Sequence, residues 1–294
     1  MNKKEIYFLI GIDFDSVAGW IGSYGGESSY GDLQQGIFAA EVGVKRLISL
    51  LKRLDLTATW FCPGLSLETF PSIAQEIASA GFEIGSHGYS HEDPRKLSVQ
   101  QERFIFKKSI SIIRELTGKK PTGYVAPHWE ITEQTSQLLN EFKFRYDHSE
   151  FHRDFEAYFM RSGERWNSID YTKEASSWCH PLVLGNTLDI VEIPANWYLD
   201  DVTPLMFMKN IQNTFGFIPA VDVFRTWYNE FRWLLNTDEE NLNVFPITLH
   251  PDVSGRAHII ESLEKFMKKI IVEKNVVNIN FNEFQEHFRM RYLK

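Results

Sequence analysis

Two histidines lie four residues apart in this chain, directly after a short apolar run that ends at Gly85. A helix or a tight turn over this spacing would point the rings of His87 and His91 the same way. Two imidazole nitrogens on one side can bind a metal ion, and a third ligand must then come from elsewhere. The best candidates are Asp13 and Asp15, at the end of the first apolar run. Two surface histidines beside an acidic loop are the alternative interpretation.

This combination of side chains predicts metal-assisted hydrolysis. Two histidines and one carboxylate suit Zn²⁺ or a similar divalent ion, and three protein ligands leave one position open for water. A bound Zn²⁺ lowers the pKa of that water to about 7 and polarises a carbonyl oxygen. A second carboxylate could accept the proton of the water, and a separate histidine could protonate a leaving nitrogen. Asp13, Asp15 and His250 have these side-chain types. A strand-end cap for the aspartates and a core histidine at 250 are the structural alternatives.

Strands and helices alternate along the chain, which predicts a parallel sheet that is closed or doubly wound. Apolar runs predict strands over residues 6–12, 56–61, 82–85, 123–126, 144–146, 190–193, 244–249 and 276–279. Helical periodicity predicts helices over residues 42–54, 70–80, 98–117, 132–142, 221–235, 258–274 and 282–289. Two stretches, 22–36 and 150–186, are expected to be loops. No linker-like tract divides residues 1–294, so we expect a single domain.

Seven or eight strands in one domain favour a (β/α) barrel, in which functional groups follow the C-terminal ends of the strands. The candidate residues have this placement: Asp13 and Asp15 follow the first strand, His87 and His91 the third, Pro127 the fourth, Trp197 the sixth and His250 the seventh. Side chains after separate strands converge at one mouth of a barrel. The fold expectation therefore strengthens the metal-site interpretation.

Three tryptophans follow strands of the expected barrel and are candidates for lining a pocket. Trp20, Trp129 and Trp197, together with Pro127, would give flat walls around a small ligand. Ordinary core packing is the alternative for each tryptophan. We therefore predict a restricted pocket that admits a small amide, imide or sugar precursor and excludes a polymer.

Composition excludes several other classes of protein. The net charge is −8 and no long Lys/Arg block occurs, which argues against nucleic-acid binding. No stretch is long and apolar enough to span a membrane, and the first apolar run does not resemble a signal segment. The two cysteines, Cys62 and Cys179, are far apart and form no disulfide framework. Such cysteine usage fits a reducing compartment, so we expect a cytoplasmic protein.

The motifs, taken in order, resemble those of the NodB-type polysaccharide deacetylases, a family also classed as carbohydrate esterase family 4. The segments that carry the resemblance are Asp13-Phe14-Asp15, residues 87–91, Val125-Ala126-Pro127, residues 194–197 and residues 247–250. Longer strings at residues 19–26, 87–92, 194–201 and 250–254 look like the branch that holds Helicobacter-type peptidoglycan deacetylases, metal-independent allantoinases and cyclic imide hydrolases. The resemblance covers nearly the whole chain.

The resemblance implies a distorted (β/α)7 barrel that assembles as a homotetramer. It implies that Asp15, His87 and His91 hold the metal, that Asp13 is the general base and that His250 is the general acid. The chain departs from the family pattern because Phe14 separates the aspartates and Gly88 replaces a serine or threonine. Val125 stands where the family has an arginine, and the acidic residue before Trp197 is missing.

Three functions are compatible with these observations. The first is removal of acetyl from an N-acetylglucosamine unit of peptidoglycan, a reaction at a linear C–N bond. The second is the opening of small cyclic imides or ureides such as allantoin. The third is an inactive barrel that binds or scaffolds. The departures weaken the inference to acetylated sugars more than the inference to C–N hydrolysis, and the retained motif residues argue against the third function.

Overall fold

The computed structural model of this chain describes residues 4–209, 216–239, 241 and 243–292. Its centre is one curled sheet with the strand order β6-β7-β5-β4-β3-β2-β1-β8, and β9 also pairs with β1. The strands are β1 (Ile6–Asp13), β2 (Thr59–Cys62), β3 (Glu83–Ser86), β4 (Gly123–Tyr124), β5 (Tyr146–Asp147), β6 (Tyr158–Ser162), β7 (Asn186–Glu192), β8 (Val244–Leu249) and β9 (Val276–Asn278). The β6–β7 pair is antiparallel and the other pairs are parallel.

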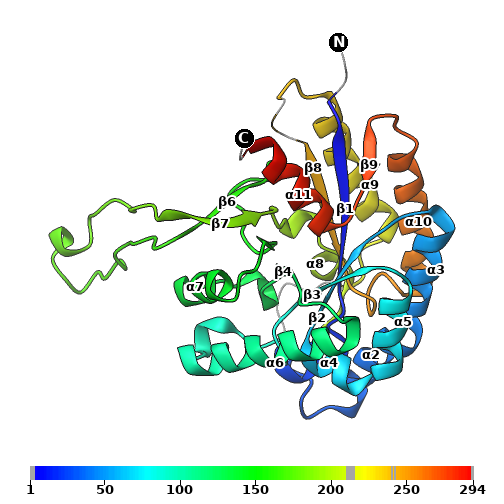
Figure 1. Cartoon of the computed structure of the whole chain (residues 1–294), viewed down its shortest axis with the longest axis horizontal. Helices are drawn as coiled ribbons and strands as arrows, with labels where there is room; N and C mark the ends of the chain where they lie inside the picture. Colours follow the sequence, from blue (N-terminus) through cyan, green and yellow to red (C-terminus); the bar gives the residue numbers. More distant parts are fainter. Residues whose placement is uncertain (1–3, 210–215, 240, 242, 293–294) are drawn as a thin grey trace.

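Helices cover the outside of the curled sheet (Figure 1). They are α1 (Ser16–Gly22), α2 (Tyr30–Phe38), α3 (Val44–Leu54), α4 (Gly64–Thr69), α5 (Pro71–Ser79), α6 (Val99–Thr117), α7 (Glu133–Glu141), α8 (Val202–Leu205), α9 (Ala220–Asn236), α10 (Ala257–Ile271) and α11 (Phe281–Tyr292). The sequence sets several of their ends. At α6, for example, Ser98 and Gln101 form a capping box, and Gly118 ends the helix with φ of 75°.

The expected α/β class and distorted (β/α)7 barrel are confirmed. Seven strands of the curled sheet (β1, β2, β3, β4, β5, β7 and β8) are parallel to one another. Within the described residues no ladder joins β7 to β8. An isolated bridge connects Asp200, which follows β7, to Thr248 in β8. The barrel is therefore incomplete on one side.

The interior of the barrel is filled by side chains, so it forms a floor under the mouth. Phe281 at the start of α11 packs edge-on against Phe61 at a centroid distance of 5.3 Å and stacks on Tyr146 at 6.1 Å. His148, at the carboxyl end of β5, lies above Phe281 at 4.9 Å and contacts Trp129 at 6.0 Å. Phe281 of α11 thus packs under His148, which in turn contacts Trp129 of the candidate site.

Two stretches expected to be loops contain regular structure. Residues 22–36 include most of α2, whose N-cap Ser29 accepts a hydrogen bond from Asp32 N at 3.2 Å. The glycines that suggested a loop permit close packing instead, because a Cβ on Gly36 would lie 2.7 Å from the backbone of Ser16. Residues 150–186 include β6, which forms a hairpin with β7.

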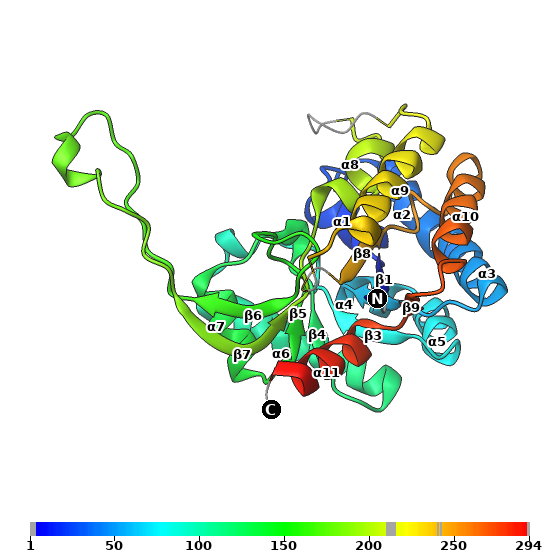
Figure 2. The same ribbon diagram turned by 90° about the horizontal axis from the view of Figure 1, so that it is seen from above.

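The tip of this hairpin, residues 163–185, projects far from the body in both views (Figures 1 and 2). We call it the arm. The sequence pattern did not predict it because the arm buries little of its apolar surface: six large apolar residues, Trp166, Ile169, Tyr171, Leu182, Val183 and Leu184, are exposed. Among the described helices, none is long and apolar enough to cross a membrane.

Candidate active site

The three predicted metal ligands meet at the carboxyl ends of β1 and β3. Asp15 Oδ1 lies 3.2 Å from His87 Nε2, and Asp15 Oδ2 lies 3.2 Å from His91 Nε2. The candidate ligand atoms of these residues all lie within 4.8 Å of one another, and all three side chains are buried. This group can hold one metal ion.

A tight turn, not a helix, brings the two histidines to the same point. Gly88 has φ of 65° and His91 has φ of 58°, so the chain reverses twice within four residues. A side chain at Gly88 would clash with Glu92, since an added Cβ would lie 2.5 Å from Glu92 Oε1. The Glu92 carboxylate holds the turn by accepting hydrogen bonds from Tyr89 N at 3.0 Å and Ser90 N at 2.6 Å. The turn explains why glycine replaces the serine or threonine of the family pattern.

The hydrogen bonds around the cluster leave its central atoms free for a cation. His87 Nδ1 donates to the Val125 carbonyl at 2.7 Å, which leaves Nε2 facing Asp15. His91 Nδ1 is similarly bonded to Ser23 Oγ at 2.5 Å. His87 Nε2 and Asp15 Oδ1 are buried without a hydrogen-bond partner. These two atoms face each other at 3.2 Å, and a divalent ion can take the place of a proton between an imidazole nitrogen and a carboxylate, so the residues fit a divalent ion.

The electrostatics of the cluster also favour a cation. Burial lowers the pKa of His87, but the carboxylates of Asp13 and Asp15 outweigh burial and raise this pKa to about 9. Burial raises the pKa of Asp15, but His91 and His87 outweigh it and hold this pKa well below its usual range. The buried carboxylates therefore attract positive charge to the position between the imidazoles.

Asp13 faces the same point without being fixed by a hydrogen bond. Its Oδ2 lies 3.8 Å from His87 Nε2 and 3.8 Å from His250 Nε2, and its buried Oδ1 has no partner among the described residues. Val125, which stands in place of the family arginine, packs in the apolar interior and offers no charge. Burial raises the pKa of Asp13. A carboxylate with a raised pKa is better suited to accepting a proton near neutral pH.

His250 is held by a carboxylate on its far side. Asp201 Oδ1 accepts from His250 Nδ1 at 2.8 Å, and Asp201 Oδ2 accepts from the His250 backbone N at 3.0 Å and from Ser254 Oγ at 2.5 Å. Burial lowers the pKa of His250, but the bond to Asp201 and the charge of Asp200 outweigh it and raise this pKa well above its usual range. His250 is thus kept protonated, with Nε2 directed toward Asp13 and Asp15 at 3.8 and 3.6 Å.

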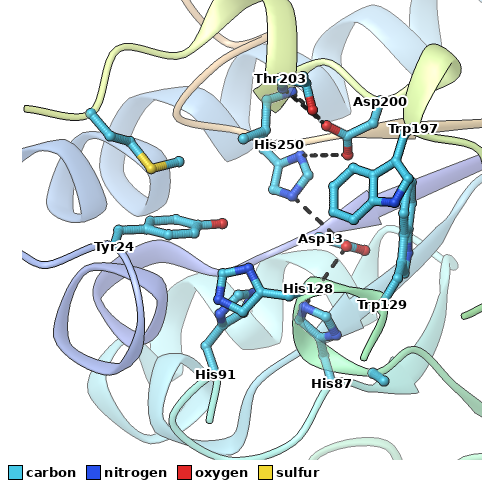
Figure 3. Close-up of a pocket in the computed structure, with 13 residues that line it drawn as sticks. Asp13, Tyr24, His87, His91, His128, Trp129, Trp197, Asp200, Thr203 and His250 are labelled. Atoms are coloured by element: carbon cyan, nitrogen blue, oxygen red, sulfur yellow. Dashed lines mark hydrogen bonds and ion pairs between the residues drawn. The ribbon is translucent and has the colours of Figure 1, made fainter. Parts of the chain in front are cut away.

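A cavity of about 350 Å³ opens over these residues (Figure 3). Its walls are largely aromatic: Trp129 and Trp197 are in contact at a centroid distance of 4.5 Å, and Tyr24 lies on the opposite side. Its polar lining includes Asp13 and His250. The cavity has the usual composition of a small-ligand site, with apolar walls and a few polar groups that fix orientation.

Two residues predicted to bind substrate do not line this cavity. Trp20 is buried with 2% exposure; its indole N–H donates to Asp252 Oδ2 at 3.2 Å, and its ring packs edge-on against Tyr24. It therefore supports the wall from behind. Pro127 begins the turn after β4 and is buried under it. The core alternative applies to Trp20, and Pro127 shapes the turn that follows β4.

Three residues of the site were missed or left without a role by the sequence patterns. Tyr24 donates to Asp15 Oδ2 at 2.5 Å; it lies in the string 19–26 that carried the resemblance, but no role was assigned to it. His128 lines the cavity next to His91. Asp201 is the partner of His250; it ends the string 194–201 that carried the resemblance, but no role was assigned to it.

Comparison with known proteins agrees with this geometry. Residues 36–146 match the polysaccharide deacetylase family model. The chain is 47% identical over 288 residues to the peptidoglycan deacetylase of Helicobacter pylori, and the match covers 98% of each chain. A solved structure from Mycobacterium smegmatis, provisionally assigned as a polysaccharide deacetylase, aligns with a TM-score of 0.83 at 25% identity and covers 100% of this chain and 93% of its own. Puue allantoinase shares the fold with a TM-score of 0.75 at 20% identity, over 100% and 93% of the two chains.

The barrel, the buried histidine and carboxylate cluster and the cavity above it define a hydrolase of C–N bonds other than peptide bonds. The chain belongs to the polysaccharide deacetylase family.

Proposed function

We propose that this protein is a Zn²⁺-dependent deacetylase that removes acetyl from a small N-acetylated sugar, such as an N-acetylglucosamine unit. The observation that carries the proposal is the group of unpartnered buried atoms Asp13 Oδ1, Asp15 Oδ1 and His87 Nε2. Asp13 and His87 line the cavity, and Asp15 lies directly against His87. The relative from Helicobacter pylori, described as a peptidoglycan deacetylase, supports acetylated sugar as the substrate class.

In this proposal Asp15, His87 and His91 hold the ion, and two histidine nitrogens with one carboxylate oxygen favour Zn²⁺. The bound ion would supply a Lewis acid for the acetyl carbonyl and a lowered pKa for water. Hydrogen bonds to His87 Nδ1 and His91 Nδ1 fix both rings with Nε2 toward Asp15, so the ligand set is preorganised.

We assign proton transfer to Asp13 and His250, which lie on the cavity side of the cluster. Asp13 is the base, because its carboxylate is buried, its pKa is raised and no hydrogen bond occupies Oδ1. His250 is the acid, because Asp201 holds it in the protonated form. His250 would deliver its Nε2 proton to the amine that leaves.

The size of the cavity supports a small substrate. About 350 Å³ is at the lower end of the range for small-molecule sites. The tryptophan pair at its wall offers flat surfaces for the apolar face of a sugar ring or for a planar ring. We therefore keep the prediction that an extended glycan is excluded.

The test compares N-acetylglucosamine, a chitin oligosaccharide and succinimide as substrates of the purified, Zn²⁺-loaded protein. We expect acetate release from N-acetylglucosamine, and we expect Asp13→Asn to lower turnover by roughly 10²–10⁴-fold while it retains the metal. Turnover of the oligosaccharide alone would contradict the small-substrate proposal. Ring opening of succinimide alone would select the cyclic imide alternative, and no turnover of any substrate would favour an inactive binding barrel.

We further propose that the protein is a homo-oligomer, a tetramer, in which the arm contacts a second copy. Six exposed large apolar side chains on one projecting hairpin form a surface that monomeric proteins rarely leave in water. If each contributes roughly 100 Å² of apolar area, the arm supplies about 600 Å² per partner, close to what a standard interface needs.

Light scattering coupled to size-exclusion chromatography tests this arrangement. We expect the intact chain to elute as a tetramer, and a variant with residues 165–183 replaced by a short glycine turn to elute as a smaller species with the same thermal stability. A monomeric intact chain contradicts the proposal.

The free thiols, buried Cys62 and exposed Cys179, support the expected reducing, cytoplasmic compartment, which cell fractionation would check.

A further inference from the structure

The turn after β4 holds two consecutive residues in an unusual backbone conformation. His128 has φ of 57° and Trp129 has φ of 52°, in the left-handed region that side chains other than glycine rarely adopt. Hydrogen bonds from Trp129 N to the Ala126 carbonyl at 2.8 Å and from Glu130 N to the Pro127 carbonyl at 3.2 Å hold the turn. Such conformations are costly and concentrate at functional sites.

The consequence of this turn is that the His128 ring lies at the wall of the cavity, directly beside the metal cluster. Its centroid is 4.8 Å from that of His91 and 6.2 Å from that of Tyr24, with both contacts edge-on. Figure 3 shows the ring between these residues and the cavity. A ligand that reaches the metal cluster must pass close to it.

The polar atoms of this ring have no partner among the residues that the structure describes. Neither His128 nitrogen makes a hydrogen bond or an ion pair with them, and the ring contacts those of Tyr24 and His91 edge-on. A neutral imidazole carries one N–H donor and one lone pair. A half-buried polar group without a partner is stabilised when a ligand supplies one.

We propose that His128 hydrogen-bonds the substrate and helps to determine its specificity, with an uncharged amide as the matching group. An amide presents both a carbonyl acceptor and an N–H donor, which complement the two nitrogens of the ring. Asp13 and Asp200 line the same cavity and disfavour an anionic group there. The inference rests on the proposed function, since it assumes that an amide substrate occupies this cavity.

Two variants separate hydrogen bonding from ring packing. His128→Asn keeps a donor and an acceptor and tolerates the left-handed backbone. His128→Phe keeps the ring contacts with His91 and Tyr24 but cannot form the bond. We expect His128→Phe to raise KM roughly 10- to 100-fold with little change in kcat, and His128→Asn to stay within a few-fold of the wild type.

The assay uses the substrate that the wild-type protein hydrolyses in the panel above, with metal content and thermal midpoint measured for each variant. A wild-type KM for His128→Phe overturns the inference. So does a loss in His128→Asn as large as in His128→Phe, or loss of metal or folding in either variant, because these results would assign His128 a structural role. No turnover by the wild type would instead overturn the proposed function.

Discussion

Replacing Asp201 by Asn should lower kcat and shift its pH dependence, because among the described residues Asp201 alone hydrogen-bonds His250 Nδ1. The Asp201 side chain is fully buried and accepts from Nδ1 at 2.8 Å, from the His250 backbone N at 3.0 Å and from Ser254 Oγ at 2.5 Å. Asn keeps the shape but removes the negative charge. The largest contribution that raises the pKa of His250 is then lost while burial still lowers it, so the pKa of the imidazole should fall.

The size of the effect follows from the bond that is lost. A hydrogen bond to a charged group is worth about 1.5–3 kcal/mol, which corresponds to roughly a 10- to 150-fold lower kcat near neutral pH. Asp200 Oδ2 remains 3.9 Å from Nδ1 and compensates in part, so we expect the lower half of that range. His250 acts in its protonated form, and activity is lost as pH rises through its pKa. The alkaline limb of the pH profile must therefore move to lower pH in the variant.

The assay is kcat against pH for the wild type, Asp201→Asn and the control Ser254→Ala. Ser254→Ala removes one bond to Asp201 but leaves the Asp201–His250 contact, so its alkaline limb should stay in place. Circular dichroism would show that each variant is folded. An Asp201→Asn protein with the kcat and alkaline limb of the wild type would refute the role of Asp201 and weaken that of His250 as the acid.

Three other changes follow from the same structure. Tyr24→Phe removes the 2.5 Å bond to Asp15 Oδ2 and should weaken Zn²⁺ affinity by roughly 10- to 100-fold, measured by competition with a chelator; unchanged affinity would contradict this support. Trp129→Ala removes one wall of the cavity and should raise KM more than it lowers kcat; a wild-type KM would leave Trp129 as a core residue. Burial raises the pKa of Asp147 to about 7 and raises the pKa of Glu192 well above its usual range. This pair therefore stabilises the fold at acid pH, and the contribution is lost as pH rises through about 7. Asp147→Asn should make the free energy of unfolding fall less over this pH range, and denaturant titrations at several pH values that show the same fall as in the wild type would contradict this.

The parallel barrel and the metal cluster were predictable from sequence because each depends on a local rule. Buried strands read as continuous apolar runs, and polar side chains just after them must meet at one mouth. That rule placed Asp13, Asp15, His87, His91 and His250 together, and the structure brings them within contact distances.

Features that depend on packing between distant segments were not predictable. Whether Trp20 lines the cavity or supports it depends on Asp252, which is 232 residues away. The position of His128 depends on a left-handed turn, which no residue pattern signalled because the two residues that adopt it are not glycine. The arm was interpreted as an irregular loop because most of its large apolar residues are exposed and give no pattern of buried positions.

The most direct test of the metal site is a crystal structure of the Zn²⁺-loaded protein with diffraction data collected on both sides of the zinc absorption edge. The account predicts one strong anomalous peak between Asp15, His87 and His91, with ligand distances of about 2.0–2.2 Å. An active protein with no peak at this position, or with its peak at another group of side chains, would contradict it.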